Sequence, residues 1–239
     1  FPEHPITMEK LIALGSITQE CAEFLEKLVK ARYSMVIGGG TGSGKTTFLA
    51  AMSEYIPRDE RLITIEDHAE LRIRGIDNLV RLEAKAANLE ENREITIRDL
   101  IKTALRMRPS RIIIGEVRSG EAGDFLSCLN TGHSGSLGSA HANSVRDMIG
   151  RLEMMVLMGM DLPIPVIRRQ IASGVEILVH LTRDKTGRRR VEEIAEITEY
   201  AEGEIQIQTL SGRNRQSELV CVSPLRHRDK LETSNETTH

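Results

Sequence analysis

A glycine-rich segment that joins a short apolar run to a helix-forming run constrains the fold of this chain more than any other feature. The apolar run covers residues 34–37, the segment reads GGGTGSGKTTF, and helix-forming residues continue to Glu54. A strand, a glycine loop and a helix in this order begin a β-α-β unit, in which the two strands run parallel. Further apolar runs, separated by helical segments, occupy residues 62–65, 111–115 and 136–140. The pattern predicts an α/β fold with a mostly parallel sheet covered by helices.

The glycine-rich segment also has the spacing of a phosphate loop, Gly39-x-x-x-x-Gly44-Lys45-Thr46. Glycines let backbone N–H groups curl around a phosphate, and the N-terminus of the following helix adds a favourable dipole. The lysine supplies a mobile positive charge, and the threonine hydroxyl is a ligand for Mg²⁺. The sequence therefore predicts a nucleoside triphosphate site formed by Gly39, Gly40, Thr41, Gly42, Ser43, Gly44, Lys45, Thr46 and Thr47.

Hydrolysis of a triphosphate also needs carboxylates near the phosphates, and two predicted strand ends supply candidates. Glu116 follows the run 111–115, in which Gly115 stands where an Asp is more usual, and Glu66 follows the run 62–65. Doubly wound sheets place their ligands at the C-terminal ends of the strands. We expect Glu116 and Glu66 to orient or deprotonate water, and Glu116 to hold Mg²⁺ together with Thr46. The alternative for each is an ordinary solvated carboxylate, which is a stronger alternative for Glu66.

Two histidines, His133 and His141, flank the small-residue run at 136–140. They have neither a cysteine partner nor the spacing of a zinc site, so we do not expect zinc. A histidine that is hydrogen-bonded near the terminal phosphate can instead report its presence. The sequence favours this role for His141, and it leaves His133 evenly balanced between this role and that of a core histidine.

Basic residues are concentrated between Arg93 and Arg118, where seven of them stand against three acidic residues in a chain of net charge −3. One interpretation is that arginines here are supplied to a triphosphate, with Arg118 as a candidate catalytic residue. The alternative is a solvated helix face, which applies above all to Arg98 and Lys102.

The chain divides into four parts by pattern: two helices in residues 1–32, a nucleotide-binding core in 33–182, a β-hairpin extension in 183–211 and a polar tail in 212–239. We expect the tail to be disordered and the polar segment 83–94 to be a loop. The chain begins with Phe1 rather than Met, so we expect a fragment without its N-terminal part. It contains no run of about 18 apolar residues, and we expect a cytoplasmic chain.

Four segments of the chain together resemble the signature boxes of the type II and type IV secretion ATPases. They read GGGTGSGKTT, ITIEDHAEL, IRDLIKTALRMRPSRIIIGEVRSGEA and NTGHSGSLGSAHANS. The words ALRMRP and SAHANS are most similar to the Tad-type (Flp) branch, which assembles pili. The resemblance covers about residues 1–210.

This resemblance implies a RecA-like P-loop core that works as a homohexamer at the cytoplasmic face of the inner membrane. Such motors push pilins or secreted proteins through a membrane platform protein, and they carry an N-terminal domain that we expect to lie outside this chain. The matching positions are Lys45 and Thr46 for phosphate and Mg²⁺, Glu116 for the atypical Walker B glutamate, Glu66 for the acidic box, and His133 and His141 for the histidine box.

We therefore expect the ATPase domain of a secretion or pilus assembly motor, which hydrolyses ATP with Mg²⁺ and does not take nucleic acid as cargo. Three other classes stay open at this point. A nucleic-acid motor would suit the basic stretch, although aromatic residues make up only 3% of the chain and its net charge is negative. A small-molecule kinase shares the phosphate loop. An assembly module that holds ATP without turnover would not need Glu116.

Overall fold

The computed structural model describes residues 6–87 and 94–236 of the 239-residue chain. Residues 1–5 and half of the segment predicted as a loop, residues 88–93, lie outside this part. Among the described helices none is long and apolar enough to cross a bilayer.

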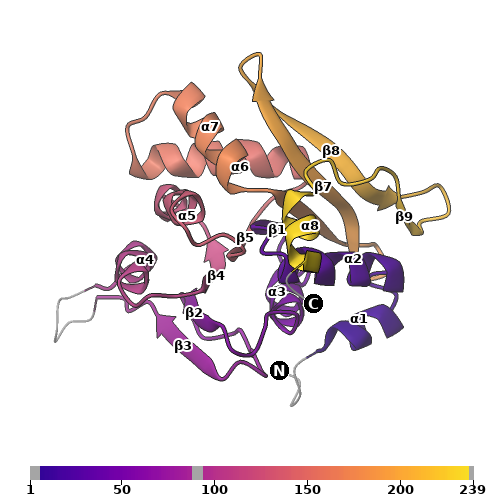
Figure 1. Cartoon of the computed structure of the whole chain (residues 1–239), viewed down its shortest axis with the longest axis horizontal. Helices are drawn as coiled ribbons and strands as arrows, with labels where there is room; N and C mark the ends of the chain where they lie inside the picture. Colours follow the sequence, from indigo (N-terminus) through magenta and orange to yellow (C-terminus); the bar gives the residue numbers. More distant parts are fainter. Residues whose placement is uncertain (1–5, 88–93, 237–239) are drawn as a thin grey trace.

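Nine strands form one sheet, in the spatial order β3-β2-β4-β5-β1-β6-β7-β8-β9 (Figure 1). The first six strands of this order pair in parallel, and the last three continue the sheet as an antiparallel meander. The expected α/β fold, with a mostly parallel sheet and an antiparallel C-terminal extension, is confirmed. The parallel strands are β3 (Asn78–Glu83), β2 (Arg61–Glu66), β4 (Arg111–Val117), β5 (Leu137–Ala140), β1 (Met35–Gly39) and β6 (Ile177–Arg183), and the antiparallel ones are β7 (Arg189–Ala201), β8 (Glu204–Arg213) and β9 (Leu219–Cys221).

Helices cover both faces of the sheet and divide the core into two clusters. Side chains alternate along a strand, so Met35 and Ile37 of β1 belong to one cluster and Val36 to the other. The first face carries α1 (Met8–Ala13), α2 (Gln19–Lys30) and α3 (Lys45–Ser53), and the second carries α4 (Ile97–Leu105), α5 (Glu121–Asn130), α6 (Val145–Gly159) and α7 (Ile164–Gly174). Because both faces are buried, the central strands are continuous apolar runs, as the sequence indicated.

The polar tail differs from the expectation of disorder. It forms β9 on the edge of β8 and then α8 (Asp229–Glu236), which lies near α2 in Figure 1. Several contacts attach this segment to the body. The Tyr33 hydroxyl donates to the backbone oxygen of His227 at 2.6 Å, and Lys230 Nζ lies 2.7 Å from a carboxylate oxygen of Glu176. Hydrogen bonds and ion pairs to partners far away in sequence order this segment, and the composition of the tail alone does not indicate them.

Candidate functional site

The phosphate loop connects β1 to α3 and depends on glycine at several positions. Gly42 and Gly44 have φ angles of +74° and +95°, a region that only glycine enters without strain. A Cβ atom on Gly39 would stand 2.7 Å from the backbone oxygen of Leu181 on β6 and even closer to the Ser43 hydroxyl. The loop therefore packs against β6 with no room for a side chain at Gly39.

Helix α3 begins at this loop without the side-chain cap that four other helices have. Helices α1, α2, α4 and α6 begin after a threonine or serine whose hydroxyl accepts a backbone N–H of the first turn. Helix α3 follows Gly44, has no such bond and has no acidic residue in its first turn. Its first N–H groups have no intrahelical acceptor, so this end of α3 is suited to an anion.

Lys45, the first residue of α3, turns back over the loop. Its ammonium donates to the backbone oxygens of Gly39 at 3.0 Å and Gly40 at 3.3 Å, and it lies 3.6 Å from Glu116 Oε1. The nearby Ser43 hydroxyl oxygen is buried and has no hydrogen-bond partner within the described protein. A cation and an unpaired hydroxyl beside free helix amides fit a bound phosphate chain.

A cavity of about 510 Å³ adjoins the outer side of the loop and has the size of a ligand pocket. Apolar side chains of α1, α3 and β6 form part of its wall, and Ser43 and Gly44 of the loop and the hairpin between β6 and β7 also line it. From this hairpin Arg189 donates to the backbone oxygen of Gly42 at 2.9 Å. The sequence analysis predicted a β-hairpin extension from residue 183 but gave its arginines no role, although the run of three arginines at 188–190 was a visible signal.

Glu116, near the end of β4, is held by Arg118, which the sequence analysis named as a candidate catalytic residue. Arg118 is held in turn by Asp67, to which the sequence analysis gave no role. Arg118 Nε and Nη2 lie 2.8 Å and 2.6 Å from Glu116 Oε2, and Nη1 lies 3.0 Å from Asp67 Oδ2. The hydrogen bond to Glu116 is the main reason that the pKa of Arg118 is raised. Glu116 thus has one oxygen directed to Arg118 and the other to Lys45.

Glu66, the last residue of β2, is only 4% exposed, and its Oε1 accepts the N–H groups of Glu70 at 3.0 Å and Leu71 at 2.8 Å. Burial raises the pKa of Glu66, and the two amide hydrogen bonds partly oppose this effect. A Cβ atom on Gly115 would stand 2.9 Å from Glu66 Cγ, which explains why glycine takes the position before Glu116. The two carboxylates therefore lie at the C-terminal ends of adjacent strands, but Oε1 of Glu66 is already hydrogen-bonded to the loop that follows β2.

The two histidines lie at opposite ends of β5. His141 directly follows this strand, and Ala140 pairs with Gly38, so His141 lies level with the start of the phosphate loop. His133 precedes the strand, where its backbone oxygen accepts the Ser136 hydroxyl at 2.7 Å. The two histidines flank the strand as expected, and of the two roles left open for His133 its position favours the one away from the phosphate loop, because a strand carries its two ends to opposite edges of the sheet.

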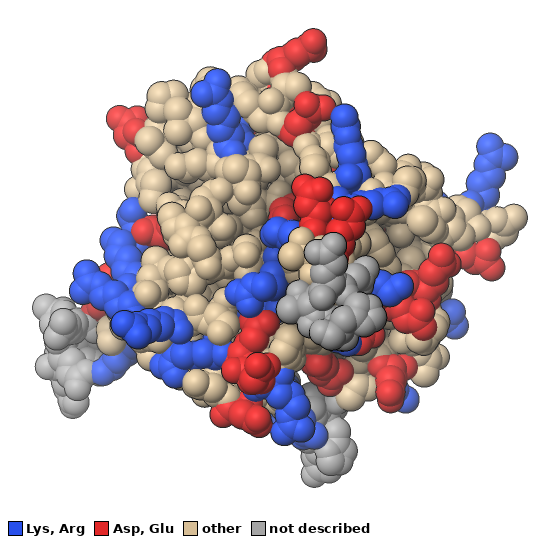
Figure 2. All heavy atoms as spheres, viewed as in Figure 1, with Lys and Arg blue, Asp and Glu red and all other residues tan. Residues whose placement is uncertain are grey.

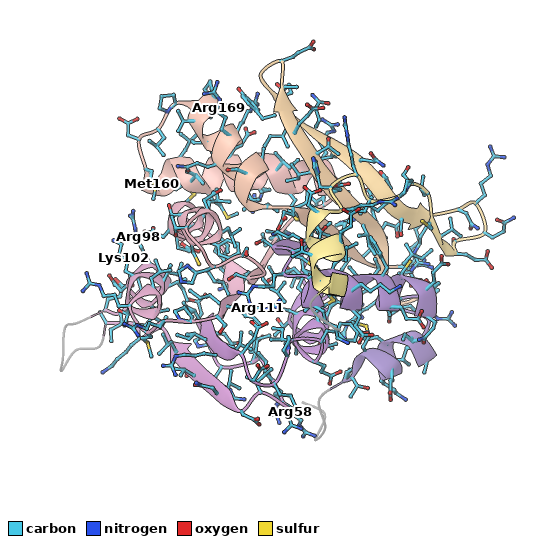
Figure 3. All side chains as sticks on the ribbon, viewed as in Figure 1. Arg58, Arg98, Lys102, Arg111, Met160 and Arg169 are labelled. Atoms are coloured by element: carbon cyan, nitrogen blue, oxygen red, sulfur yellow. The ribbon has the colours of Figure 1, made fainter. Side chains whose placement is uncertain are left out.

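The predicted basic stretch divides into separate environments. Figure 2 shows blue side chains gathered where α4 and β3 lie in Figure 1, and Figure 3 places Arg98 and Lys102 on α4 at this side. Arg98 pairs with Asp124 at 2.7 Å, whereas Arg111 is fully buried at the start of β4. Arg93 lies outside the described residues. Of the arginines that the sequence analysis named in this stretch and the structure describes, Arg118 is the one that contacts the candidate site.

The fold and the loop define a class of protein, the P-loop nucleotide-binding proteins with a RecA-like core. In this arrangement one strand, β5, stands between the strand of the phosphate loop and the strand that carries Glu116.

Comparisons with known proteins give the family. The family described as type II/IV secretion system protein matches residues 1–238. A Mycobacterium tuberculosis protein with a provisional conjugal-transfer assignment is 44% identical over 200 residues, which are 84% of this chain and 56% of that protein. The type IV secretion system protein VirB11 of Brucella suis is 42% identical over 75% of this chain and 52% of its own length.

The crystal structure of the Brucella suis VirB11 ATPase in complex with sulphate superposes with a TM-score of 0.66 at 38% identity, covering 78% of this chain and 56% of that one. This chain belongs to the type II/IV secretion system protein family, and its relatives include ATPases, as the resemblance implied. The chain spans about half the length of the curated relatives that it matches.

Proposed function

We propose that this chain is the ATPase part of a secretion or pilus assembly motor and that it hydrolyses ATP at the C-terminal edge of its parallel strands. The observation that carries this proposal is the geometry around Lys45. The uncapped start of α3, the Lys45 ammonium and the Glu116 carboxylate 3.6 Å from it converge on the phosphate loop. The names of VirB11, a type IV secretion protein, and of its crystallised ATPase support the cellular role.

The loop residues, from Gly39 to Thr47, bind the phosphates in this proposal. The backbone amides and Lys45 neutralise the phosphate charge, and the Ser43 hydroxyl gains the partner that it lacks within the protein. The adjoining cavity receives the nucleoside, with its apolar wall against the base and the hairpin arginines near the sugar and phosphates. His141, level with the start of the loop, is placed to sense the terminal phosphate.

Oxygen ligands for Mg²⁺ come from Thr46 in the first turn of α3 and from Glu116. The described residues contain no group of three or more His, Cys, Asp or Glu side chains arranged as a metal site. This fits Mg²⁺, which proteins often hold through one or two side chains together with the phosphates of a nucleotide. When bound, the ion neutralises charge on the phosphates.

Glu116 is the better candidate for the residue that orients the attacking water. Its Oε1 faces Lys45, whereas Oε1 of Glu66 already accepts two backbone N–H groups. In this proposal Glu66 supports the loop after β2 and Arg118 holds Glu116 in place. The charge and reach of Glu116 suit polarisation of a water molecule next to the phosphates.

The working form in this proposal is a homohexamer at the inner face of the cell membrane, acting on a membrane platform protein and not on nucleic acid. Two basic residues of the stretch support the last point, because Arg111 is buried and Arg98 is paired with Asp124, so neither cation is free for a polyanion. In this proposal each chain contributes a nucleotide site, and the homohexamer of such chains works as the motor.

The test compares Lys45→Ala with Lys30→Ala, which removes an exposed lysine paired with Glu26 on α2. We expect Lys45→Ala to abolish ATP hydrolysis, measured by phosphate release, with little change in melting temperature, and Lys30→Ala to match the wild type. Wild-type turnover in Lys45→Ala would contradict the proposed function.

A further inference from the structure

Arg118 is held from three sides although most of its side chain faces solvent. Its guanidinium contacts Glu116 at 2.6–2.8 Å and Asp67 at 3.0 Å, and its side chain is 61% exposed. Its backbone N–H donates to Glu121 Oε1 at 2.6 Å, and the N–H of Ser119 donates to the same oxygen at 3.0 Å. Glu121 is the first residue of α5 and is 9% exposed.

Fold stability does not explain this arrangement well. Ion pairs between exposed side chains contribute about 0–1 kcal/mol, because solvent screens them and ordering long side chains costs entropy. The consequence of the arrangement is instead geometric. Arg118 occupies Oε2 of Glu116, and this leaves Oε1 directed to Lys45 at 3.6 Å. Asp67 accepts a hydrogen bond from Nη1 of the same guanidinium. The guanidinium therefore cannot rotate away from Glu116 without losing its contact with Asp67.

We propose that Asp67 and Glu121 are positioning residues for the hydrolysis of ATP. Asp67 fixes the guanidinium of Arg118, and Glu121 fixes the backbone that carries it, so that the carboxylate of Glu116 keeps one orientation toward the phosphate loop. This inference rests on the proposed function. Neither residue contacts the loop itself among the described hydrogen bonds, and both act through Arg118. Holding a reacting group in one orientation lowers the activation barrier because the ordering cost is met before the reaction.

The kinetic test uses Asp67→Ala in the full-length protein. We expect kcat to fall by about tenfold, within the range of a lost catalytic orientation, while KM for ATP changes by less than about twofold. Asp67→Asn keeps an oxygen acceptor for Arg118, so it should recover part of the lost kcat. A residue with a merely structural role would lower the amount of folded protein and would not separate kcat from KM in this way.

A double mutant shows whether Asp67 acts through Arg118. Two residues that work through one shared contact give non-additive effects. We expect Asp67→Ala to lower kcat in the wild-type background and to have no further effect in the Arg118→Ala background. Multiplicative effects of the two substitutions would overturn the proposal.

A second readout does not depend on activity. Arg118 Nε–H donates to Glu116 in the described structure, so its proton should exchange slowly with solvent in nuclear magnetic resonance spectra of ¹⁵N-arginine-labelled protein. We expect Asp67→Ala and Glu121→Ala each to accelerate this exchange several-fold. Unchanged exchange in both variants would contradict the positioning role.

The matched control is Asp77→Ala, which removes the partner of Arg58 from an ion pair of 3.3 Å whose side chains are 71% and 75% exposed. This variant should leave kcat, KM and Arg118 exchange unchanged. Failure of the inference is separable from failure of the proposed function. Wild-type kcat in Asp67→Ala with no turnover in Lys45→Ala rejects the positioning role alone, whereas turnover in Lys45→Ala rejects the ATPase itself.

Discussion

Arg111 and Lys45 lie at opposite ends of the parallel part of the sheet, and their surroundings differ. Arg111, at the start of β4, is fully buried; Nε and Nη2 donate to the two carboxylate oxygens of Glu60 at 2.7 Å each, and Nη1 donates to the Val29 backbone oxygen at 2.6 Å. Lys45, after β1, has two backbone oxygens and an acidic neighbour at 3.6 Å. The first cation is satisfied in full, and the second keeps capacity for a ligand.

The same contrast extends to the other polar groups at the two ends. At the N-terminal end of the strands the Ser136 hydroxyl accepts the Ile112 N–H at 3.0 Å, and Glu176 accepts the Ser34 N–H at 2.8 Å. At the C-terminal end the Ser43 hydroxyl is buried without a partner in the described protein, and α3 has no side-chain cap. The comparison teaches that polar groups at one end of the sheet are satisfied within the protein, whereas those at the other end keep the capacity that the proposed nucleotide site requires.

The largest expected effect is on stability, from Arg111→Met. Removing this cation leaves the Glu60 carboxylate, which is 13% exposed, without its main partner. Breaking a buried ion pair on one side typically costs about 3–5 kcal/mol, so we expect a loss of this size in the free energy of unfolding. Denaturant titration measures it.

The control for Arg111→Met is Arg58→Met, because Figure 3 shows Arg58 at the periphery and Arg111 inside the molecule. Arg58→Met should change the unfolding free energy by less than about 0.5 kcal/mol. Equal losses in both variants would remove the basis for the contrast between the two ends.

The second effect is on chemistry, from Glu116→Gln. The substitution keeps the shape of the side chain and removes its charge, so we expect ATP to bind and hydrolysis to fall by about 10²-fold or more. Phosphate release measures this effect. The comparison with Glu66→Gln decides the assignment: full turnover in Glu116→Gln with none in Glu66→Gln would reverse the roles of the two carboxylates.

The third prediction concerns the stability of the protein at acidic pH. Burial alone would raise the pKa of Glu60, but the hydrogen bonds and charges of Arg111 and Arg32 outweigh it, so the net pKa lies below the usual value of 4.5. A carboxyl whose pKa is lowered on folding stabilises the protein above its unfolded pKa, and this contribution is lost as the pH falls through the folded value. We expect the wild type to lose unfolding free energy below about pH 4.5, and Glu60→Gln to be less stable at neutral pH but to depend less on pH in this window. An equally steep acid dependence in Glu60→Gln would contradict the prediction.

The smallest effect has the opposite sign and comes from Glu66. Its pKa is raised, mainly by burial, so the folded state favours the protonated form and the ionised form costs stability near neutral pH. We expect Glu66→Gln to raise the unfolding free energy slightly at pH 7, by less than about the 1 kcal/mol of one hydrogen bond. The difference from the wild type should shrink as the pH falls toward 4, where Glu66 itself becomes protonated. A clear loss of stability at pH 7 would show that the amide bonds of Glu66 outweigh its burial.

The sequence predicted those features that are encoded within one short segment. The phosphate loop, the parallel strands β1, β2, β4 and β5, and the placement of Glu116 at a strand end each follow from a local pattern, and the structure has them in the predicted places. Strand β3 was not predicted, and the run of β6 was expected in the antiparallel meander, although it pairs in parallel with β1. The reason for glycine at position 115 could not be predicted from the sequence, because it depends on contact with Glu66 from a neighbouring strand. The same holds for Asp67, which meets Arg118 only after β2 and β4 are paired.

The separation of His133 from His141 follows from the sequence, because the expected strand between them advances about 3.3 Å per residue. The ordered tail could not be predicted, because Glu196 binds it through the N–H groups of Arg226 and His227, which lie 30 and 31 residues away. Long-range contacts between polar groups leave no period in the sequence.

The central claim, that one end of the sheet binds nucleotide and the other stabilises the fold, is tested most directly by measuring two quantities on Lys45→Met and Arg111→Met. These are the affinity for a nonhydrolysable ATP analogue with Mg²⁺ and the free energy of unfolding. We predict that Lys45→Met loses affinity by at least about tenfold, the equivalent of about 1.4 kcal/mol, and keeps its unfolding free energy within about 1 kcal/mol. Arg111→Met should lose about 3–5 kcal/mol of stability and keep its affinity in the folded fraction. Wild-type affinity in Lys45→Met, or lost affinity in folded Arg111→Met, would contradict the account.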